Sequence, residues 1–262
     1  MIKLEVFNCP GKSFTDSELE KLHQEILSVA KECLDEIPHY QCLTGDRKEY
    51  SRLIISLARD ENGTLVGFCS SYILEVGDKK VLHLGLTCVS PSARSMGLTH
   101  KLSSKVVKYY LLNYSLLRPA WISNVACVLS SLGNVALHFE NVYPSPFKKG
   151  PTVEQIEIAR FIDENYRNEL YINKGARFCD KKFIFEESVT GTMFEKSAED
   201  KRFFHRDGEV NQFYKNIIDF ERGDEVLQIG QVSLLTVPRY AWKKMKRKIF
   251  RPIRIDSVKE MA

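Results

Sequence analysis

The sequence predicts an α+β fold in which helices flank one mixed, mostly antiparallel sheet. Three β-like segments follow one another within residues 51–89, and the turns between them are short enough to favour antiparallel pairing. An amphipathic helical pattern stands on each side of this block. Strand patterns over 177–186 and 226–237 extend the sheet, so strands and helices alternate around one core.

The N-terminal part is predicted to be a strand followed by a helix. Residues 2–8 alternate in polarity, which indicates the strand, and a turn is expected at 10–11. Thr15 and Glu18 have capping-box spacing, so a helix begins there, and Pro38 ends it. Its apolar positions recur at steps of three and four: Leu19, Leu22, Ile26, Val29, Cys33 and Ile37.

The next three segments are predicted to form an antiparallel meander. Residues 51–60 and 64–76 have strand composition, and Asn62-Gly63 between them is a strong hairpin signal. A second tight turn leads into a third strand over 80–89.

A helix is expected over 97–113 and a short strand over 118–123. Ser123 and Asn124 can cap a further helix, because apolar residues then recur at helical spacing up to residue 139. A strand over 121–129 is the alternative interpretation, and the pattern leaves both open.

The C-terminal half is longer and more polar. Its predicted elements are a loop at 143–146, a helix over 152–173 that ends at Gly175, and strands over 177–186 and 226–237. Residues 187–225 are mixed and polar, which indicates an insertion with a short helix at 211–220. We therefore expect one domain over 1–238, followed by a tail over 239–262.

Composition is that of an ordinary soluble protein, with 262 residues, of which 44% are hydrophobic and 27% charged. No stretch approaches the roughly 18 apolar residues of a membrane helix, and no secretory signal is evident. The seven cysteines are unevenly spaced and lack a CxxC pair, which favours reduced thiols over disulfides or zinc. We expect a cytoplasmic protein without a membrane span or a metal site.

The charge is unevenly distributed. Residues 239–262 contain nine Lys or Arg and two Asp or Glu, whereas the other 238 residues contain 29 basic and 32 acidic side chains. A basic tail on a nearly neutral body indicates what the protein binds rather than how it folds.

The segment between the third strand and the next helix carries the chemical information. It runs from Val89 to Leu102 and includes Arg94 and Gly97. A helix that begins at a glycine turn presents unpaired N–H groups and a positive dipole end, which suit a pyrophosphate. The glycine lets the phosphate approach closely, and the arginine adds charge.

This segment resembles the cofactor motif of the GNAT superfamily of N-acetyltransferases. That motif has Arg or Gln, two residues, Gly, one residue, and Gly or Ala; here the places are held by Arg94, Gly97 and Thr99. Thr99 departs from the pattern. The resemblance covers roughly residues 1–140 in element order, and it implies a GNAT-like fold with an expanded C-terminal half.

The resemblance implies acetyl-CoA as acyl donor and an amine, unidentified by the sequence, as acceptor. In the family the fourth and fifth strands splay and hold the pantetheine arm, which implies contacts at Thr87, Cys88, Val89 and Asn124. For Asn124, a helix cap is an equally good interpretation. The turn implied to contact the pyrophosphate consists of Arg94, Ser95, Met96, Gly97, Leu98 and Thr99.

Attack on a thioester needs a neutral amine, so a general base would help. The family's base, counted back six residues from Val89, corresponds to His83, and an imidazole titrates near neutral pH. A hydrogen-bonded structural histidine is the alternative, and Glu75 on the neighbouring strand is the second candidate. The departing thiolate needs a proton, for which the family's Leu-Tyr-x-x-x-Gly pattern points to Tyr171, with Tyr143 in another register.

Direct acetyl transfer, with His83 as general base, is the function that these features favour. Two other classes stay open. One is a CoA-binding module without catalysis. The other is a binder of nucleic acid or anionic membrane surfaces through the basic tail, in which Trp242, Met245, Ile249 and Phe250 interrupt the lysines and arginines. The sequence does not specify the oligomeric state.

Overall fold

The computed structural model describes residues 2–236. The basic tail predicted over 239–262 and the last residue of the predicted strand over 226–237 lie outside this range. No helix within the described range is both long and apolar enough to cross a membrane.

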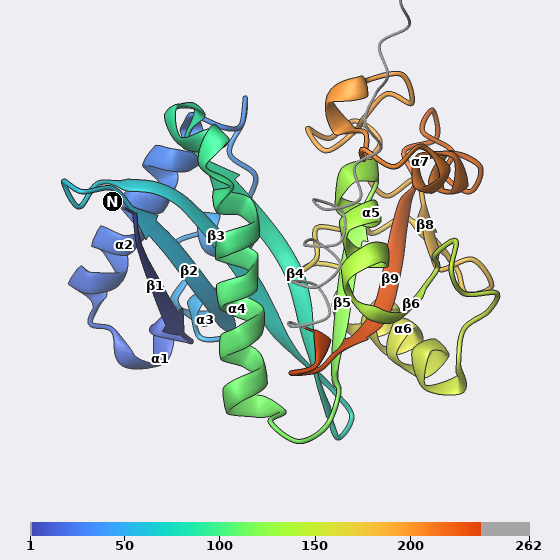
Figure 1. Ribbon diagram of the computed structural model, residues 1–262, viewed down its shortest axis with the longest axis horizontal. Helices are drawn as coiled ribbons and strands as arrows, with labels where there is room; N and C mark the ends of the chain where they lie inside the picture. Colours follow the sequence, from blue (N-terminus) through green and yellow to red (C-terminus); the bar gives the residue numbers. More distant parts are fainter. Residues whose placement is uncertain (1, 237–262) are drawn as a thin grey trace, which may run out of the picture.

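The described strands form one sheet in the order β1-β2-β3-β4-β5-β9-β8-β7, and β6 pairs with β9 (Figure 1). Neighbouring strands are antiparallel, except that β4 and β5 are parallel. The α+β prediction with a mostly antiparallel sheet is therefore confirmed. The strands are β1 (Lys3–Asn8), β2 (Leu53–Arg59), β3 (Leu65–Val76), β4 (Lys79–Val89), β5 (Ala120–Ala126), β6 (Glu140–Tyr143), β7 (Arg177–Cys179), β8 (Ile184–Glu186) and β9 (Glu225–Val232).

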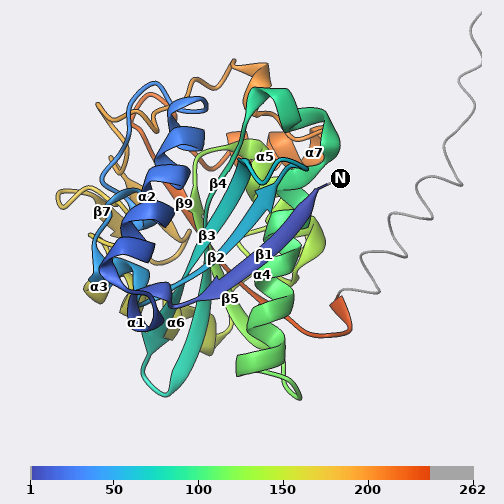
Figure 2. The same ribbon diagram turned by 90° about the vertical axis from the view of Figure 1, so that its left-hand side faces the viewer.

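Helices cover both faces of the sheet. Helix α4 lies across one face of the N-terminal strands, with α5 on the same side over β5 and β9, while α2 covers the opposite face (Figures 1 and 2). Apolar residues of α2 and α6 pack together with the sheet in one buried cluster, and those of α4 form a second. The helices are α1 (Pro10–Ser13), α2 (Asp16–Lys31), α3 (Arg47–Tyr50), α4 (Leu98–Tyr114), α5 (Leu129–His138), α6 (Val153–Asn165) and α7 (Gly208–Lys215), with 3₁₀ turns η1 (Gln41–Leu43), η2 (Pro91–Met96) and η3 (Lys201–Phe203).

The locally encoded signals of the N-terminal half are confirmed. The Thr15 hydroxyl accepts a hydrogen bond from the Glu18 N–H, and the Glu18 carboxylate accepts one from the Thr15 N–H at 2.7 Å. Gly63 adopts a φ of +83° in the β2–β3 turn, a conformation that favours glycine. The predicted strands and the helix after them fall at β2, β3, β4 and α4, within three residues at each end.

Two predicted boundaries in this half are wrong. The helix that was expected to reach Pro38 ends at Lys31, because the chain turns so that the Cys33 thiol donates a hydrogen bond to the Val89 carbonyl at 3.3 Å. The expected turn at 10–11 is one turn of helix, α1, with proline near its start, where no N–H is required.

The expected helix cap at Ser123 and Asn124 is also wrong. Both residues lie inside β5, where Ser123 pairs with Ile229 and Asn124 with Gln228. Pairing with β9 keeps the chain extended to Ala126, so the alternative strand interpretation was the better one, although α5 begins at Leu129.

The C-terminal half departs most from the predictions. The helix expected over 152–173 stops at Asn165, because the next residue, Tyr166, bonds through its hydroxyl to the backbone of Glu75 on β3. The strand expected over 177–186 is a hairpin of β7 and β8, since Phe183 turns the chain with a φ of +55°. The insertion helix is α7, which begins at Gly208 because the Asp207 carboxylate caps it.

Candidate active site

Strands β4 and β5 run together for only three residues and then separate (Figure 1). The paired residues are Val81 with Trp121, Leu82 with Ile122, and His83 with Ser123. Beyond them β4 stays paired with β3 and β5 with β9, so the two facing edges diverge. A cavity of about 570 Å³ opens in this gap, lined by residues of β4, β5, α4 and α5 together with Phe194 and Glu225.

A bulge in β4 shapes one wall of the cavity. Ser71 pairs with Leu84 but Cys69 pairs with Thr87, so an extra residue is accommodated around Gly85. Gln41 lies against this bulge: its amide oxygen accepts hydrogen bonds from the Ser70 hydroxyl at 2.5 Å and from the Leu86 N–H at 3.3 Å. The Gln41 side chain is buried, and its backbone holds a φ of +49°.

The glycine turn stands between η2 and α4. Gly97 has a φ of +65°, and a Cβ placed on it would meet no atom within 4 Å, so its surroundings are open. Helix α4 starts at the next residue, and Thr99 and His100 of its first turn line the cavity. The unpaired N–H groups of this helix end therefore adjoin the cavity.

The residues predicted to contact the cofactor fall into three groups. Thr87, Thr99 and Asn124 line the cavity. Cys88, Val89 and Leu98 are buried beside it, so of these only backbone groups could face a ligand. The turn residues Arg94, Ser95, Met96 and Gly97 are exposed, and the Arg94 Nε lies 3.5 Å from the Val89 carbonyl oxygen.

Asn124 belongs to a buried polar network that the sequence did not reveal. Its amide donates a hydrogen bond to the Gln228 amide oxygen at 3.0 Å, and Gln228 donates to the Tyr214 hydroxyl at 2.6 Å. The Tyr214 hydroxyl donates to the Pro144 carbonyl at 3.0 Å. The cavity wall at β5 is thus braced from α7 and the β6 loop.

His83 is 1% exposed, and its Nδ1 lies 3.0 Å from the Ser123 hydroxyl across the paired part of β4 and β5. Burial lowers the pKa of His83 to about 3, so its ring stays neutral well below physiological pH. His83 is absent from the described residues that line the cavity.

Glu75, the second candidate base, is exposed near the opposite end of the β3–β4 hairpin. It pairs with Lys80 and holds Tyr166 through its backbone. The structure therefore does not bring Glu75 to the cavity, and the prediction that it acts there has no support from its position.

Tyr171 lies in the turn after α6, with a φ of +60°, rather than at the end of a helix. Its ring centroid is 5.3 Å from that of Phe194, a cavity-lining residue, and 6.0 Å from that of Tyr40. The other candidate acid, Tyr143, donates its hydroxyl proton to the Lys181 carbonyl at 2.7 Å and packs on Phe183, and it is not among the described residues that line the cavity.

Glu225 is a functional candidate that the sequence did not reveal. It is the first residue of β9, is 8% exposed, and lines the cavity. Its carboxylate accepts a hydrogen bond from the Ser188 hydroxyl at 2.6 Å, and burial raises its pKa to about 7 despite that bond. It escaped notice because it ends a polar insertion, where a lone glutamate carries no signal.

Metal chemistry has no evident place among residues 2–236, where no group of three His, Cys, Asp or Glu side chains is arranged to hold an ion. The seven cysteines are free thiols. Burial raises the pKa of Cys88 and Cys127, so both thiols stay protonated at neutral pH.

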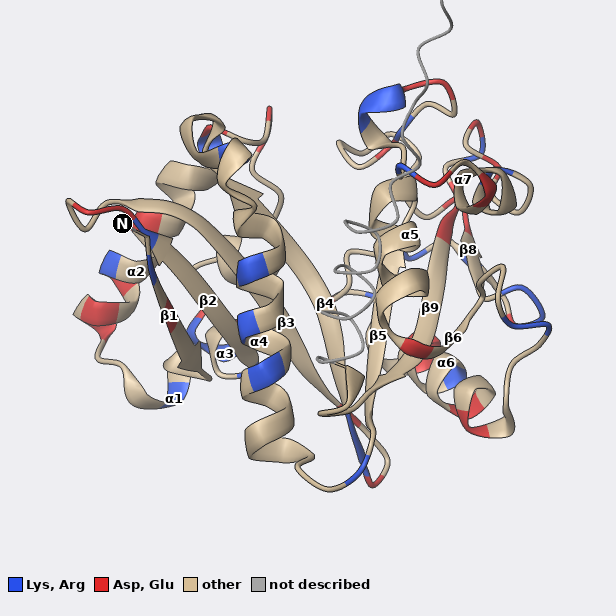
Figure 3. Cartoon of the chain, viewed as in Figure 1, with Lys and Arg blue, Asp and Glu red and all other residues tan. Residues whose placement is uncertain are grey.

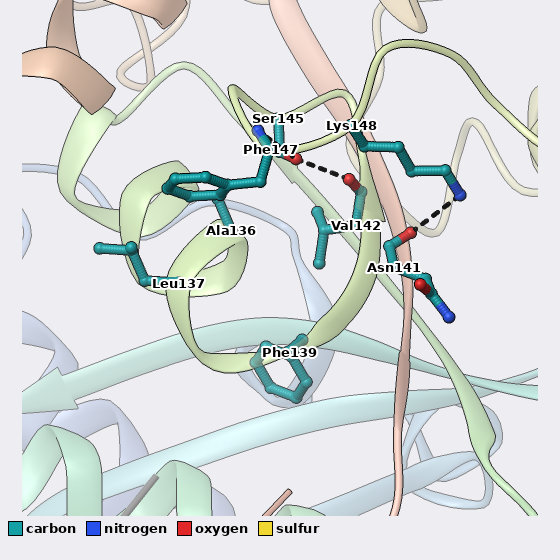
Figure 4. A pocket seen from close by; sticks show the side chains of 8 residues that line it. All are labelled: Ala136, Leu137, Phe139, Asn141, Val142, Ser145, Phe147 and Lys148. Carbon is teal, nitrogen blue, oxygen red and sulfur yellow. Dashed lines mark hydrogen bonds between the residues drawn. The ribbon is translucent and has the colours of Figure 1, made fainter. Parts of the chain in front are cut away.

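A second, smaller hollow of about 360 Å³ lies beside α5 and β6 (Figure 4). Its polar groups are largely engaged within the fold: the Ser145 hydroxyl donates to the Val142 carbonyl at 2.7 Å, and the Lys148 ammonium donates to the Asn141 carbonyl at 3.4 Å (Figure 4). The Lys148 ammonium also donates to Gln155 at 2.7 Å. The cavity between β4 and β5 is therefore the better candidate for a reaction site.

Residues 17–121 match the family model described as "Acetyltransferase (GNAT) family". The match begins in α2, includes the bulged β4 and the Gly97 turn, and ends at the start of β5. The match covers 105 of the 262 residues, so this segment, which contains the glycine turn and the bulged strand, is similar to the GNAT acetyltransferase family.

Solved structures with partial similarity carry related names. They include an aminoglycoside N-acetyltransferase AAC(6')-Iy in complex with CoA, at 20% identity over 44% of this chain and 72% of that one, with a TM-score of 0.31. YhbS from Escherichia coli in complex with CoA has 14% identity over 48% and 62%, with a TM-score of 0.33. A ribosomal-protein-alanine N-acetyltransferase from Brucella melitensis biovar Abortus 2308 has 15% identity over 44% and 76%, with a TM-score of 0.30. No curated protein matches the chain.

Proposed function

We propose that this chain transfers an acetyl group from acetyl-CoA directly to an acceptor amine, with the cofactor in the cavity between β4 and β5. The observation that carries the proposal is the separation of two parallel strands beside the Gly97 turn. The separated edges offer backbone hydrogen bonds to an extended arm such as pantetheine. The start of α4 offers unpaired N–H groups to a pyrophosphate.

Charge on α4 supports the same placement. Lys101, Lys105 and Lys108 are spaced by four and three residues, so they share one face of the helix. Figure 3 shows blue bands of basic residues along α4. Lys108 also lines the cavity. A cofactor with three phosphate groups would find its positive complement on this helix.

The sequence predicted that His83 accepts the proton of the amine. A ring with a pKa near 3 has little affinity for a proton at neutral pH, and its Nδ1 is occupied by Ser123. The role of His83 as base thus rests on the family resemblance alone.

Tyr171 is proposed as the proton donor to the departing thiolate. Its support is the contact of its ring with Phe194, a residue that lines the cavity, although Tyr171 itself is not among the described lining residues. The variant Tyr171→Phe keeps the ring and removes the hydroxyl, so a donor role predicts lower turnover with little change in acceptor binding.

The test is release of CoA thiol from acetyl-CoA, measured with and without phenethylamine, spermidine or kanamycin, together with mass spectrometry of the amine. The proposal predicts thiol release that depends on an amine and yields the acetylated amine. Tight acetyl-CoA binding without release in the presence of any amine would instead identify a CoA-binding module without catalysis.

A further inference from the structure

We propose that Glu225 and the rings of Tyr40, Tyr171 and Phe194 form the acceptor subsite, which binds a primary amine as its cation and removes its proton. The inference rests on the proposed function, because it assigns the second substrate of the same reaction. The substrate class is a primary amine whose ammonium group is carried on an apolar or aromatic stem.

Glu225 occupies a position from which it can meet an incoming amine. It is the only carboxylate among the described residues that line the cavity, and its chain neighbour Val226 pairs with Ala126 at the open end of β5. No lysine or arginine within residues 2–236 forms an ion pair with Glu225. A buried carboxylate without a cation of its own is a strong binding partner for a cationic substrate.

Three aromatic rings from distant parts of the chain meet beside this carboxylate. The ring centroids of Tyr40 and Phe194 are 6.2 Å apart, and Tyr171 contacts both. Burial raises the pKa of Tyr40, and the charge of Glu225 adds to the effect, so the two side chains interact electrostatically. Aromatic faces attract cations, which makes the cluster a suitable wall for an ammonium group and its stem.

The cluster is joined to the bulge of β4 by a short chain of contacts. Gln41 donates a hydrogen bond to the Tyr40 hydroxyl at 2.8 Å, while its amide oxygen holds the Leu86 N–H of the bulge. On the other side the Cys127 thiol donates to the Phe194 carbonyl at 3.2 Å. The subsite thus adjoins the cofactor cavity at the point where β4 and β5 separate.

Three of the six described non-glycine residues with a positive φ lie in or beside this subsite. Gln41, Tyr171 and Glu187, the residue before Ser188, hold positive φ values of 49°, 60° and 60°. Such conformations cost free energy, and they persist where the surrounding structure holds side chains for a task. Here they help to position the rings of Tyr40 and Tyr171 and the Ser188 hydroxyl that bonds to Glu225.

Other ionisable groups near Glu225 are protonated or bonded to other partners. Tyr40 and the protonated Cys127 lie within its electrostatic reach. The next carboxylate in the chain, Asp224, is neutralised by Arg222 at 2.8 Å, and the Lys196 ammonium is held by the Met193 and Glu195 carbonyls. These contacts leave the carboxylate of Glu225 available to exchange a proton with substrate.

The proton balance of the step is complete. The ammonium group gives one proton to the Glu225 carboxylate, and the neutral nitrogen attacks the thioester carbonyl carbon. The C–N bond forms and the C–S bond breaks. Tyr171 gives its hydroxyl proton to the departing CoA sulphur, and the second proton lost by nitrogen restores the Tyr171 hydroxyl. Glu225 then returns its proton to solvent.

The test compares Glu225→Gln with the exposed control Glu221→Gln, using acetyl-CoA and phenethylamine as substrates across pH 5 to 9. Wild type and the control should show kcat/KM rising through a group near pH 7. Glu225→Gln should lose that ionisation and about 10²- to 10⁴-fold in kcat/KM, with acetyl-CoA affinity unchanged. A fully active Glu225→Gln with the same pH profile would overturn the assignment.

The aromatic wall is tested separately by Phe194→Leu, with the exposed Phe147→Leu as control. The first should raise the KM for phenethylamine about tenfold, and the second should leave it unchanged. An unchanged KM for phenethylamine in Phe194→Leu would overturn the aromatic wall while leaving the proposed acetyl transfer standing. No acetylation of phenethylamine, spermidine or kanamycin by a protein that binds acetyl-CoA would instead overturn the proposed function itself, and so would failure to bind acetyl-CoA.

Discussion

A Cβ atom on Gly85 would lie 2.2 Å from the side-chain nitrogen of Gln41, so the two residues fit together only while position 85 is glycine. Gly85→Ala should therefore push Gln41 out of its place and cost about 1–3 kcal/mol of unfolding free energy, measured by urea denaturation. It should also weaken acetyl-CoA binding, because the bulge that it distorts is a wall of the cavity. Substituting Gln41→Ala in the same chain should restore part of the loss, and an additive double variant would refute this steric coupling.

Asn124→Ala tests the network that braces β5. The change leaves the buried Gln228 oxygen without its donor, which should cost about 1–3 kcal/mol and loosen the cavity wall. We expect a lower melting temperature together with several-fold weaker acetyl-CoA binding. Exposed Asn113 on α4 offers the control, since Asn113→Ala should change neither quantity by much.

The contribution of His83 to the stability of the protein should fall on mild acidification. Its pKa is lowered from an ordinary 6.5 to about 3, so the unfolded chain binds a proton below pH 6.5 and the folded chain does not. The stabilisation is complete above pH 6.5 and is lost as the pH falls, by about 1–2 kcal/mol between pH 6.5 and 5.

The variant His83→Gln should lack this contribution and should keep turnover per folded molecule within a few-fold of wild type. Melting temperature and turnover are measured on the same preparation at pH 5, 6.5 and 8. A loss of 10²-fold in turnover with an intact fold would reinstate His83 as the general base.

The contribution of Glu225 to the free energy of unfolding should depend on pH with the opposite sign. Its pKa is raised from 4.5 to about 7, so the folded protein binds this proton more tightly than the unfolded chain does. The associated stability is present below pH 4.5 and is lost as the pH rises through 7. Glu225→Gln, which stays neutral, should gain melting temperature relative to wild type between pH 5 and 8. A constant difference across that range would contradict the buried, protonatable state.

The parts of this fold that the sequence predicted are those set by local chemistry. The Thr15 capping box, the Asn62-Gly63 turn and the glycine at position 97 each act within a few residues, so their structural consequences could be foreseen. The separation of β4 from β5 was implied only by family resemblance, since it depends on the pairing of β5 with β9, about a hundred residues later.

What the sequence did not predict depends on contacts between distant segments. Asn124 extends a strand because β9, about a hundred residues later, pairs with it. Glu225 meets Tyr40 and Phe194 only through the folded sheet. Helical spacing after Ser123 misled for the same reason, because pairing with a remote strand outweighed a local pattern.

The most direct measurement is calorimetric titration of acetyl-CoA into wild type, Gly97→Glu and Gly77→Glu. Gly77 is a matched control: it lies in the β3–β4 turn with a φ of +60°, and a Cβ there would also meet nothing within 4 Å. A carboxylate at position 97 should repel the pyrophosphate from the start of α4, so Gly97→Glu should lose binding while Gly77→Glu keeps it. Equal affinity of wild type and both variants would contradict the placement of the cofactor between β4 and β5.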